Sequence, residues 1–290
     1  MGEEHSTEAP ANKKNKKLIV GIVVAVIAVA AAAFWYVSYQ IPHSQAVASF
    51  ETAASGLEDR NAVLDGAVGD LQALVDSEDK PYDSATTDAA NTAISQAQEA
   101  RADVPEMPSG TAEINAAASD IDGLGDYSSQ LDALASASTN LQNSIDQLKQ
   151  VTNPTEQFVI ERLTGLANIT ATEAVTEDND PNGKLNKAGG YTAAVNFSSD
   201  LVDQSKVFLD PSFTGLAAAG CDGGGTVEVY STSDEAKARD TYLAAFDGTV
   251  LSPGSHSVVG SCVVRTSDLL TASQQKTLEQ EITQSLLRMD

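Results

Sequence analysis

The chain has 290 residues and a formal net charge of −24, so it is strongly acidic and long enough for more than one domain. This charge argues against nucleic acid or anionic lipid as a partner, because both are polyanionic. Its only cysteines are Cys221 and Cys262, and it has 3 histidines, which leaves few ligands for a transition-metal centre.

The first element in chain order is an apolar segment, Leu18 to Val37, that contains no charged residue. As a helix it covers roughly 30 Å, the thickness of the hydrocarbon core of a bilayer. Lysines precede it and an aromatic group around Trp35 ends it. By the positive-inside rule, residues 1–17 form a cytoplasmic basic tail, residues 18–37 cross the lipid bilayer of the cell membrane, and the rest is extracellular. A cleaved signal peptide is the alternative, although its apolar region is usually shorter.

Residues 40–151 are rich in Ala, Ser, Asp, Gln and Leu, a composition that favours helix. The first part has a heptad seam, in which an apolar residue recurs every seven positions: Phe50, Leu57, Leu64 and Leu71. Further helices are predicted over residues 83–104 and 111–151, the latter interrupted near Gly123 and Gly125. The region is therefore predicted to be a helical stalk or three-helix bundle.

Asn153-Pro154 is the predicted boundary of a C-terminal domain over residues 154–290. Alternating apolar residues predict four strands, and a short edge strand is predicted at 207–209. The four strands cover residues 169–177, 191–198, 226–231 and 257–266, and the helices begin at Pro154, Ser233 and Ala272. The fold class is therefore α+β with an antiparallel-rich sheet. A Cys221–Cys262 disulfide is predicted, since a lone cysteine pair outside the cell is typically oxidised.

An oxygen-rich loop with the sequence DNDPNG lies between the first two strands. Asp178, Asp180 and Asn182, followed by a glycine, match the start of a calcium loop, and the nearby Glu173 or Glu177 offers further oxygens. The acid expected at the twelfth position is absent. The alternative is a hairpin loop built on Asx turns, which uses the same residues for backbone reasons. Beyond this weak Ca²⁺ hypothesis, no cofactor is predicted.

Residues 255–257 read Ser-His-Ser, a combination also found in nucleophilic catalysis. No orienting acid or nucleophile elbow stands near it in sequence, so His256 is expected to lie in a surface loop. The glycine-rich CDGGGT segment lacks the lysine of a phosphate loop and is expected to be a flexible turn. No catalytic residue is predicted.

The C-terminal domain resembles a domain that recurs in actinobacterial surface proteins and lipoproteins, notably from bifidobacteria. The resemblance covers roughly residues 154–287, and EDNDPNG, GGYT and CVVRTS are its most specific pieces. Some of these relatives carry a label that refers to the extracellular-matrix-binding Ebh adhesins. The resemblance implies a surface location and an α+β fold, and it implies no mechanism.

Together these features predict a membrane-anchored cell-surface protein that presents a non-catalytic binding domain to an extracellular or envelope partner. Two other classes stay open. A structural or assembly component of the envelope needs a large apolar interface. An enzyme or ligand sensor needs a cleft with perturbed ionisable groups or a cytoplasmic effector.

Overall fold

The structure is a computed structural model that describes residues 13–249 and 252–289. Spatial contacts divide the chain into two compact units, and each is described by itself. One unit contains Met1–Gly69 and Ser95–Ala133, and the other contains Asp70–Ile94 and Leu134–Asp290. The α+β class is confirmed, because the chain combines helices with a five-stranded antiparallel sheet.

The described part of the chain begins with a continuous helical run that contains the apolar segment. It consists of α1 (Lys13–Trp35), the π-helical turn η1 (Tyr36–Gln40) and α2 (Ile41–Val75). From residue 20 to residue 37 every side chain is exposed, and the most apolar stretch has no protein cover. Within the described residues this is the one helix long and apolar enough to cross a membrane, a property that signal sequences near an N-terminus share. The chain is therefore compatible with single-pass anchoring.

Three further helices follow: α3 (Ala85–Ala100), α4 (Thr111–Asp122) and α5 (Ser128–Gln150). In the first unit, Phe50 and Leu57 of α2 pack against Ile114 and Ile121 of α4. The predicted heptad seam is confirmed by burial, since all four of its residues are nearly inaccessible. The predicted helix over residues 111–151 is two helices, separated where Gly125 adopts a φ of 75° that other residues avoid.

A buried polar contact fixes the loop after α3 in the first unit. The hydroxyl of Tyr127 donates to Asn61 Oδ1 over 2.7 Å and accepts the N–H of Ala102 over 2.9 Å. The amide of Asn61 donates in turn to the Ala102 carbonyl over 2.8 Å. These three hydrogen bonds pair polar groups that would otherwise lack a partner inside the unit. The cluster therefore holds the loop after α3 against α2.

The second unit contains the sheet, whose strand order is β1-β2-β3-β5-β4 with every neighbouring pair antiparallel. Its strands are β1 (Ile169–Ala174), β2 (Ala193–Ser199), β3 (Gly224–Val229), β4 (His256–Val259) and β5 (Cys262–Thr266). Its helices are α6 (Glu156–Leu163), α7 (Ser233–Ala244) and α8 (Ala272–Leu287). Thr232 and Thr271 cap the N-termini of α7 and α8, and Thr271 forms a complete capping box with Gln274.

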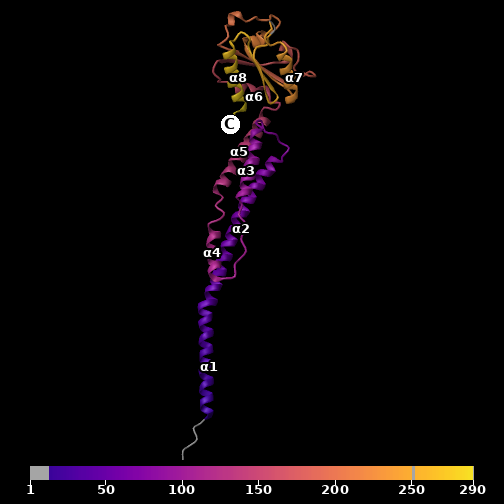
Figure 1. The fold of residues 1–290 in the computed structure, drawn as a ribbon. Helices are drawn as coiled ribbons and strands as arrows, with labels where there is room; N and C mark the ends of the chain where they lie inside the picture. The colour runs from indigo at the N-terminus through magenta and orange to yellow at the C-terminus, as the bar shows by residue number, and fades with distance from the viewer. Residues whose placement is uncertain (1–12, 250–251, 290) are drawn as a thin grey trace, which may run out of the picture. The chain divides into compact units, whose positions relative to one another are not determined.

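Helices cover the two faces of this sheet differently, with α6 and α8 on one side and α7 on the other (Figure 1). The α6–α8 face is apolar and buries Val195, Phe197, Val227 and Val264 with residues of both helices. The α7 face has a smaller apolar cluster, to which Val263 of β5 and Leu243 of α7 belong. The rest of the α7 face carries polar side chains, which form the candidate site below.

Two predicted strands differ from the structure. The segment 257–266 is a hairpin of β4 and β5, because Gly260 has a φ of 62° and turns the chain at a two-residue loop. A Cβ on this glycine would lie 2.4 Å from the carbonyl oxygen of Val151. The edge strand predicted at 207–209 does not form, since β1 and β4 are the sheet edges and Phe208 is exposed in a loop.

The predicted Cys221–Cys262 disulfide is wrong, since both cysteines are free thiols. Cys262 begins β5 and its side chain lies in the α6–α8 core. Cys221 lies in the 3₁₀ turn before β3 and lines a cavity with Arg265. Arg265 is near the end of β5 and on the sheet face opposite to Cys262. A disulfide needs Cα atoms within about 7 Å, which this placement prevents. Burial raises the pKa of Cys221 to about 11 and that of Cys262 to about 12, so both thiols stay protonated.

Candidate functional site

The α7 face of the sheet places four polar side chains side by side on three neighbouring strands. Asn196 of β2 accepts the hydroxyl hydrogen of Thr226 of β3 over 2.7 Å, and Glu228 follows Thr226 on the same face. Arg265 of β5 is the register partner of Thr226. Alternation along each strand explains this arrangement, because valines at the intervening positions point into the α6–α8 core.

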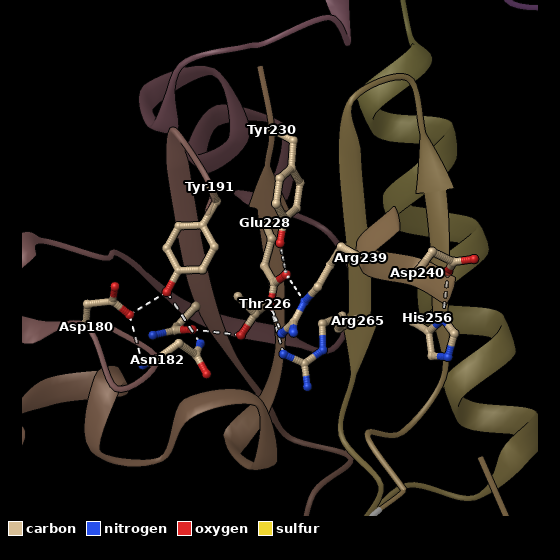
Figure 2. A network of polar contacts seen from close by, with 11 residues as sticks. Asp180, Asn182, Tyr191, Thr226, Glu228, Tyr230, Arg239, Asp240, His256 and Arg265 are labelled. Atoms are coloured by element: carbon tan, nitrogen blue, oxygen red, sulfur yellow. Dashed lines mark hydrogen bonds and ion pairs between the residues drawn. The ribbon is translucent and has the colours of Figure 1, made fainter. Parts of the chain in front are cut away.

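Glu228 is the centre of this face and is fully buried. Arg239 of α7 binds it with two donors, Nε to Oε2 over 2.8 Å and Nη2 to Oε1 over 2.9 Å. Arg265 donates Nη1 to Oε1 over 2.8 Å, and Tyr230 donates its hydroxyl to Oε2 over 2.9 Å (Figure 2). Burial raises the pKa of the Glu228 carboxyl, but the two guanidinium groups outweigh it and hold the pKa below its usual value. Glu228 is thus a charged carboxylate.

Two tyrosine rings stand beside this ion cluster. The rings of Tyr191 and Tyr230 meet edge to face with centroids 6.4 Å apart. Their hydroxyls point in the same direction in Figure 2 and donate to two buried carboxylates, Asp180 and Glu228. Burial, and then the adjoining carboxylates, raise the pKa of both tyrosines above its ordinary value, so both hydroxyls stay protonated. The rings are therefore fixed and neutral.

The DNDPNG loop is organised by Asp180. Its Oδ2 accepts the N–H groups of Lys184 over 2.6 Å and Leu185 over 2.8 Å, and its Oδ1 accepts the N–H of Asn182 over 3.0 Å and the Tyr191 hydroxyl. Burial raises the pKa of Asp180, and these four hydrogen bonds lower it by more. This is the Asx-turn arrangement, in which a side chain replaces backbone partners.

The calcium prediction stays a prediction, and these contacts support its Asx-turn alternative. Asp178 and Asn182 are exposed while Asp180 is buried, and both oxygens of Asp180 already accept hydrogen bonds from the loop and from Tyr191. The expected additional oxygens have other partners, since Glu173 accepts the N–H of Leu216 and Glu177 accepts the amide of Asn186. Over residues 13–249 and 252–289, no group of three His, Cys, Asp or Glu side chains is placed to hold a metal ion.

A concave site, called the α7 cleft here, lies between α7 and the loop 180–191. The hollow beside Tyr191 and Tyr230, called its main hollow here, has a volume of about 470 Å³, within the roughly 300–1,000 Å³ range of small-molecule sites. A second hollow of about 480 Å³ shares Asn182, Arg239 and Tyr242 with it. The walls of the main hollow include Asn182, Lys184, Tyr191, Tyr230, Glu235, Arg239 and Tyr242. Asn182 and Tyr191 also line a smaller hollow of about 120 Å³ beside it, together with Cys221 and Arg265. The cleft thus combines aromatic rings with both signs of charge.

His256 does not lie in a surface loop, so that prediction is wrong. It begins β4, and its side chain is 7% exposed. Its Nδ1 lies 2.6 Å from Asp240 Oδ1 and its Nε2 lies 3.3 Å from Asp247 Oδ1. The neighbouring Ser255 hydroxyl donates to Glu279 instead of to the imidazole. Because each ring nitrogen contacts a carboxylate, neither is available to take a proton from a serine.

Glu228, Arg239, Arg265 and Tyr242 were not predicted from the sequence. The sequence does contain a pattern that points to Glu228 and Arg265. In TVEVYS and CVVRT, polar residues alternate with valines, so Glu228 and Arg265 fall on the sheet face opposite the valines that precede them. Arg239 and Tyr242 give no comparable signal, since α7 has polar residues around most of its surface.

Comparison with known proteins gives no assignment: no family model, no curated protein and no solved structure matches the chain.

Proposed function

We propose that this chain is a single-pass protein of the cell membrane that presents a non-catalytic ligand-binding domain outside the cell, with residues 1–17 in the cytoplasm. The observation that carries the proposal is the uncovered apolar helix, because a water-soluble protein does not expose such a segment along its whole length. The lysines before it favour a cytoplasmic N-terminus. The resemblance to actinobacterial surface proteins agrees with this location.

The α7 cleft supports binding as the activity of the exposed domain. Its volume suits a small molecule or the side chain of a larger partner. Its ionisable groups favour binding over acid–base catalysis, since Glu228 is held charged by two arginines and the two tyrosines are held neutral. General acid–base catalysis needs a group that gains and loses a proton near the working pH. The partner is an extracellular or envelope component.

Topology is the first test. In cells that express the full chain with one tag at each end, we expect added protease to remove the C-terminal tag and to spare the N-terminal tag. The chain should stay in the membrane fraction in alkaline carbonate and leave it in detergent. Full release by carbonate, or protection of the C-terminal tag in intact cells, refutes the proposed topology. A processed chain that lacks its N-terminal tag and is found in the medium identifies a signal peptide.

A further inference from the structure

The α7 cleft has the composition of a site for a neutral, hydroxyl-rich ring compound, and this deepens the function proposed above. Three tyrosines line its main hollow: Tyr191, Tyr230 and Tyr242. The first two are only 2% and 3% exposed and their hydroxyls are bound to Asp180 and Glu228, so Tyr242 is the ring that a ligand can reach. The two buried rings fix the wall behind it, which does not rearrange when a ligand enters.

Tyr242 forms the outer edge of the cleft. It is 58% exposed, which is unusual for an aromatic side chain that lines a hollow. Its orientation is fixed from two sides, because the Arg239 guanidinium lies 5.5 Å from its ring centroid and the ring of Phe246 meets it at 5.3 Å. An exposed ring held in place offers a flat surface onto which the C–H face of a ligand can stack.

The polar groups around these rings supply donors and acceptors in a compact set. Arg239 uses Nε and Nη2 for Glu228, which leaves the Nη1 hydrogens for another acceptor. Asn182 donates its amide to Tyr191 and keeps its amide oxygen as an acceptor. Glu235 Oε2 is buried, and no described residue supplies it with a hydrogen bond. Hydroxyl groups, which both donate and accept, match this mixture better than purely anionic or cationic groups do.

Charge supports the same conclusion. Around the main hollow, the three cations of Lys184, Arg239 and the adjoining Arg265 are matched by three carboxylates, those of Glu235, Glu228 and Asp180. The complete chain carries a net charge of −24, which repels an anionic ligand on its approach. A neutral ligand is not repelled by the net charge of the chain, and it needs no excess of either charge in the cleft.

We infer that the α7 cleft binds a neutral saccharide, with a sugar ring stacked on Tyr242 and its hydroxyls hydrogen-bonded to Arg239, Asn182 and Glu235. A saccharide has an apolar C–H face and a polar rim, and the cleft presents the complement of both. Because the hollow holds about 470 Å³, it accommodates a unit of one or two sugar rings of a longer glycan.

The test uses the full-length chain in nanodiscs and isothermal titration with disaccharides that differ in charge. The neutral probe is N,N′-diacetylchitobiose, the cationic probe is its deacetylated form, and the anionic probe is a disaccharide with a uronic acid. Free amino acids form a fourth arm. We expect the neutral probe to bind at least about tenfold more tightly than the charged probes.

Substitutions locate the binding. Tyr242→Ala should weaken the neutral probe about tenfold, since the stacking surface is lost. Tyr242→Phe keeps the ring and should bind within about twofold of the unchanged chain. Phe208→Ala removes an aromatic ring that is 73% exposed and does not line the cleft, and it should have no effect. Because Tyr242 and Phe208 are exposed, these variants leave the core intact, which a melting curve verifies.

The outcomes separate this inference from the function on which it rests. Tighter binding of a charged disaccharide or an amino acid, lost in Tyr242→Ala, overturns the saccharide assignment and retains a binding cleft. Neutral binding that Tyr242→Ala does not weaken overturns the assignment of the site. If no probe of any class binds, and a wider screen of peptides and small molecules also finds nothing, both the saccharide inference and the binding function fail.

Discussion

Replacement of Glu228 by glutamine tests whether the ion cluster holds α7 on the sheet. The substitution keeps the size of the side chain and removes its charge, so Arg239 and Arg265 remain side by side without a shared anion. Their side chains are 21% and 12% exposed, so water screens the repulsion only partly. Breaking a buried ion pair by removal of one partner typically costs about 3–5 kcal/mol.

This magnitude is measurable as a change in melting temperature. For a folded body of about 150–250 residues, 1 kcal/mol corresponds to about 2–4 °C, so Glu228→Gln should lower the Tm by roughly 6–20 °C. Near-ultraviolet circular dichroism of the tyrosines reports this transition, because the sole tryptophan, Trp35, lies in the apolar helix. Hydrogen exchange should locate the loss of protection in β3, β5 and α7.

A matched control is Asp79→Asn, which removes the carboxylate of an exposed pair. Lys149 lies 2.6 Å from Asp79, but both side chains are about half exposed, and such pairs contribute at most about 1 kcal/mol. If Glu228→Gln costs no more than this control, the Glu228 cluster does not stabilise the fold and the reasoning is refuted.

The same cluster predicts an acid-sensitive stability. The pKa of Glu228 is lower in the folded state than its usual value, so its contribution is present above the unfolded-state pKa of about 4.3 and is lost as pH falls through the folded pKa. The unchanged chain should therefore lose stability below about pH 4. In Glu228→Gln this part of the acid dependence should be absent.

Three further predictions concern other contacts. Tyr127→Phe should cost about 1–3 kcal/mol in urea unfolding, because it leaves buried groups of Asn61 and Ala102 unpaired, and no measurable loss contradicts the contact. Asp180→Asn should speed proteolysis within residues 181–190, whereas Asp178→Asn should not, and millimolar Ca²⁺ should leave the Tm of the unchanged chain unaltered. A thiol reagent should count two thiols in the denatured chain without prior reduction, and a count of zero restores the disulfide.

The sequence predicted most of the fold because its signals were local. The heptad seam and the four alternating strands arise from neighbouring residues, and each has its counterpart in the structure. The hairpin of β4 and β5 was missed because a single glycine interrupts an otherwise continuous β-branched run. Such a run fits one long strand as well as two short ones.

The site was harder to predict, because its parts meet only through the sheet order. Glu228 and Arg265 are adjacent since β5 follows β3 in the sheet, an arrangement that no local pattern specifies. The disulfide prediction failed for the same reason. The disulfide was predicted because the domain was expected to lie outside the cell, but the pleat places Cys262 in the α6–α8 core and Cys221 beside Arg265.

The DNDPNG loop is a local sequence pattern that also contributes to the candidate site. Its oxygens suggested a cation, but Asp180 directs both of its oxygens to the loop backbone and to Tyr191. An acidic loop that binds its own backbone is rigid without a metal, and rigidity is what a cleft wall needs. Because Tyr191 joins the loop to the aromatic wall, Asp180 positions the α7 cleft without lining its main hollow. If the proposed binding function is correct, the DNDPNG loop supports the wall of the ligand site through Asp180 and Tyr191.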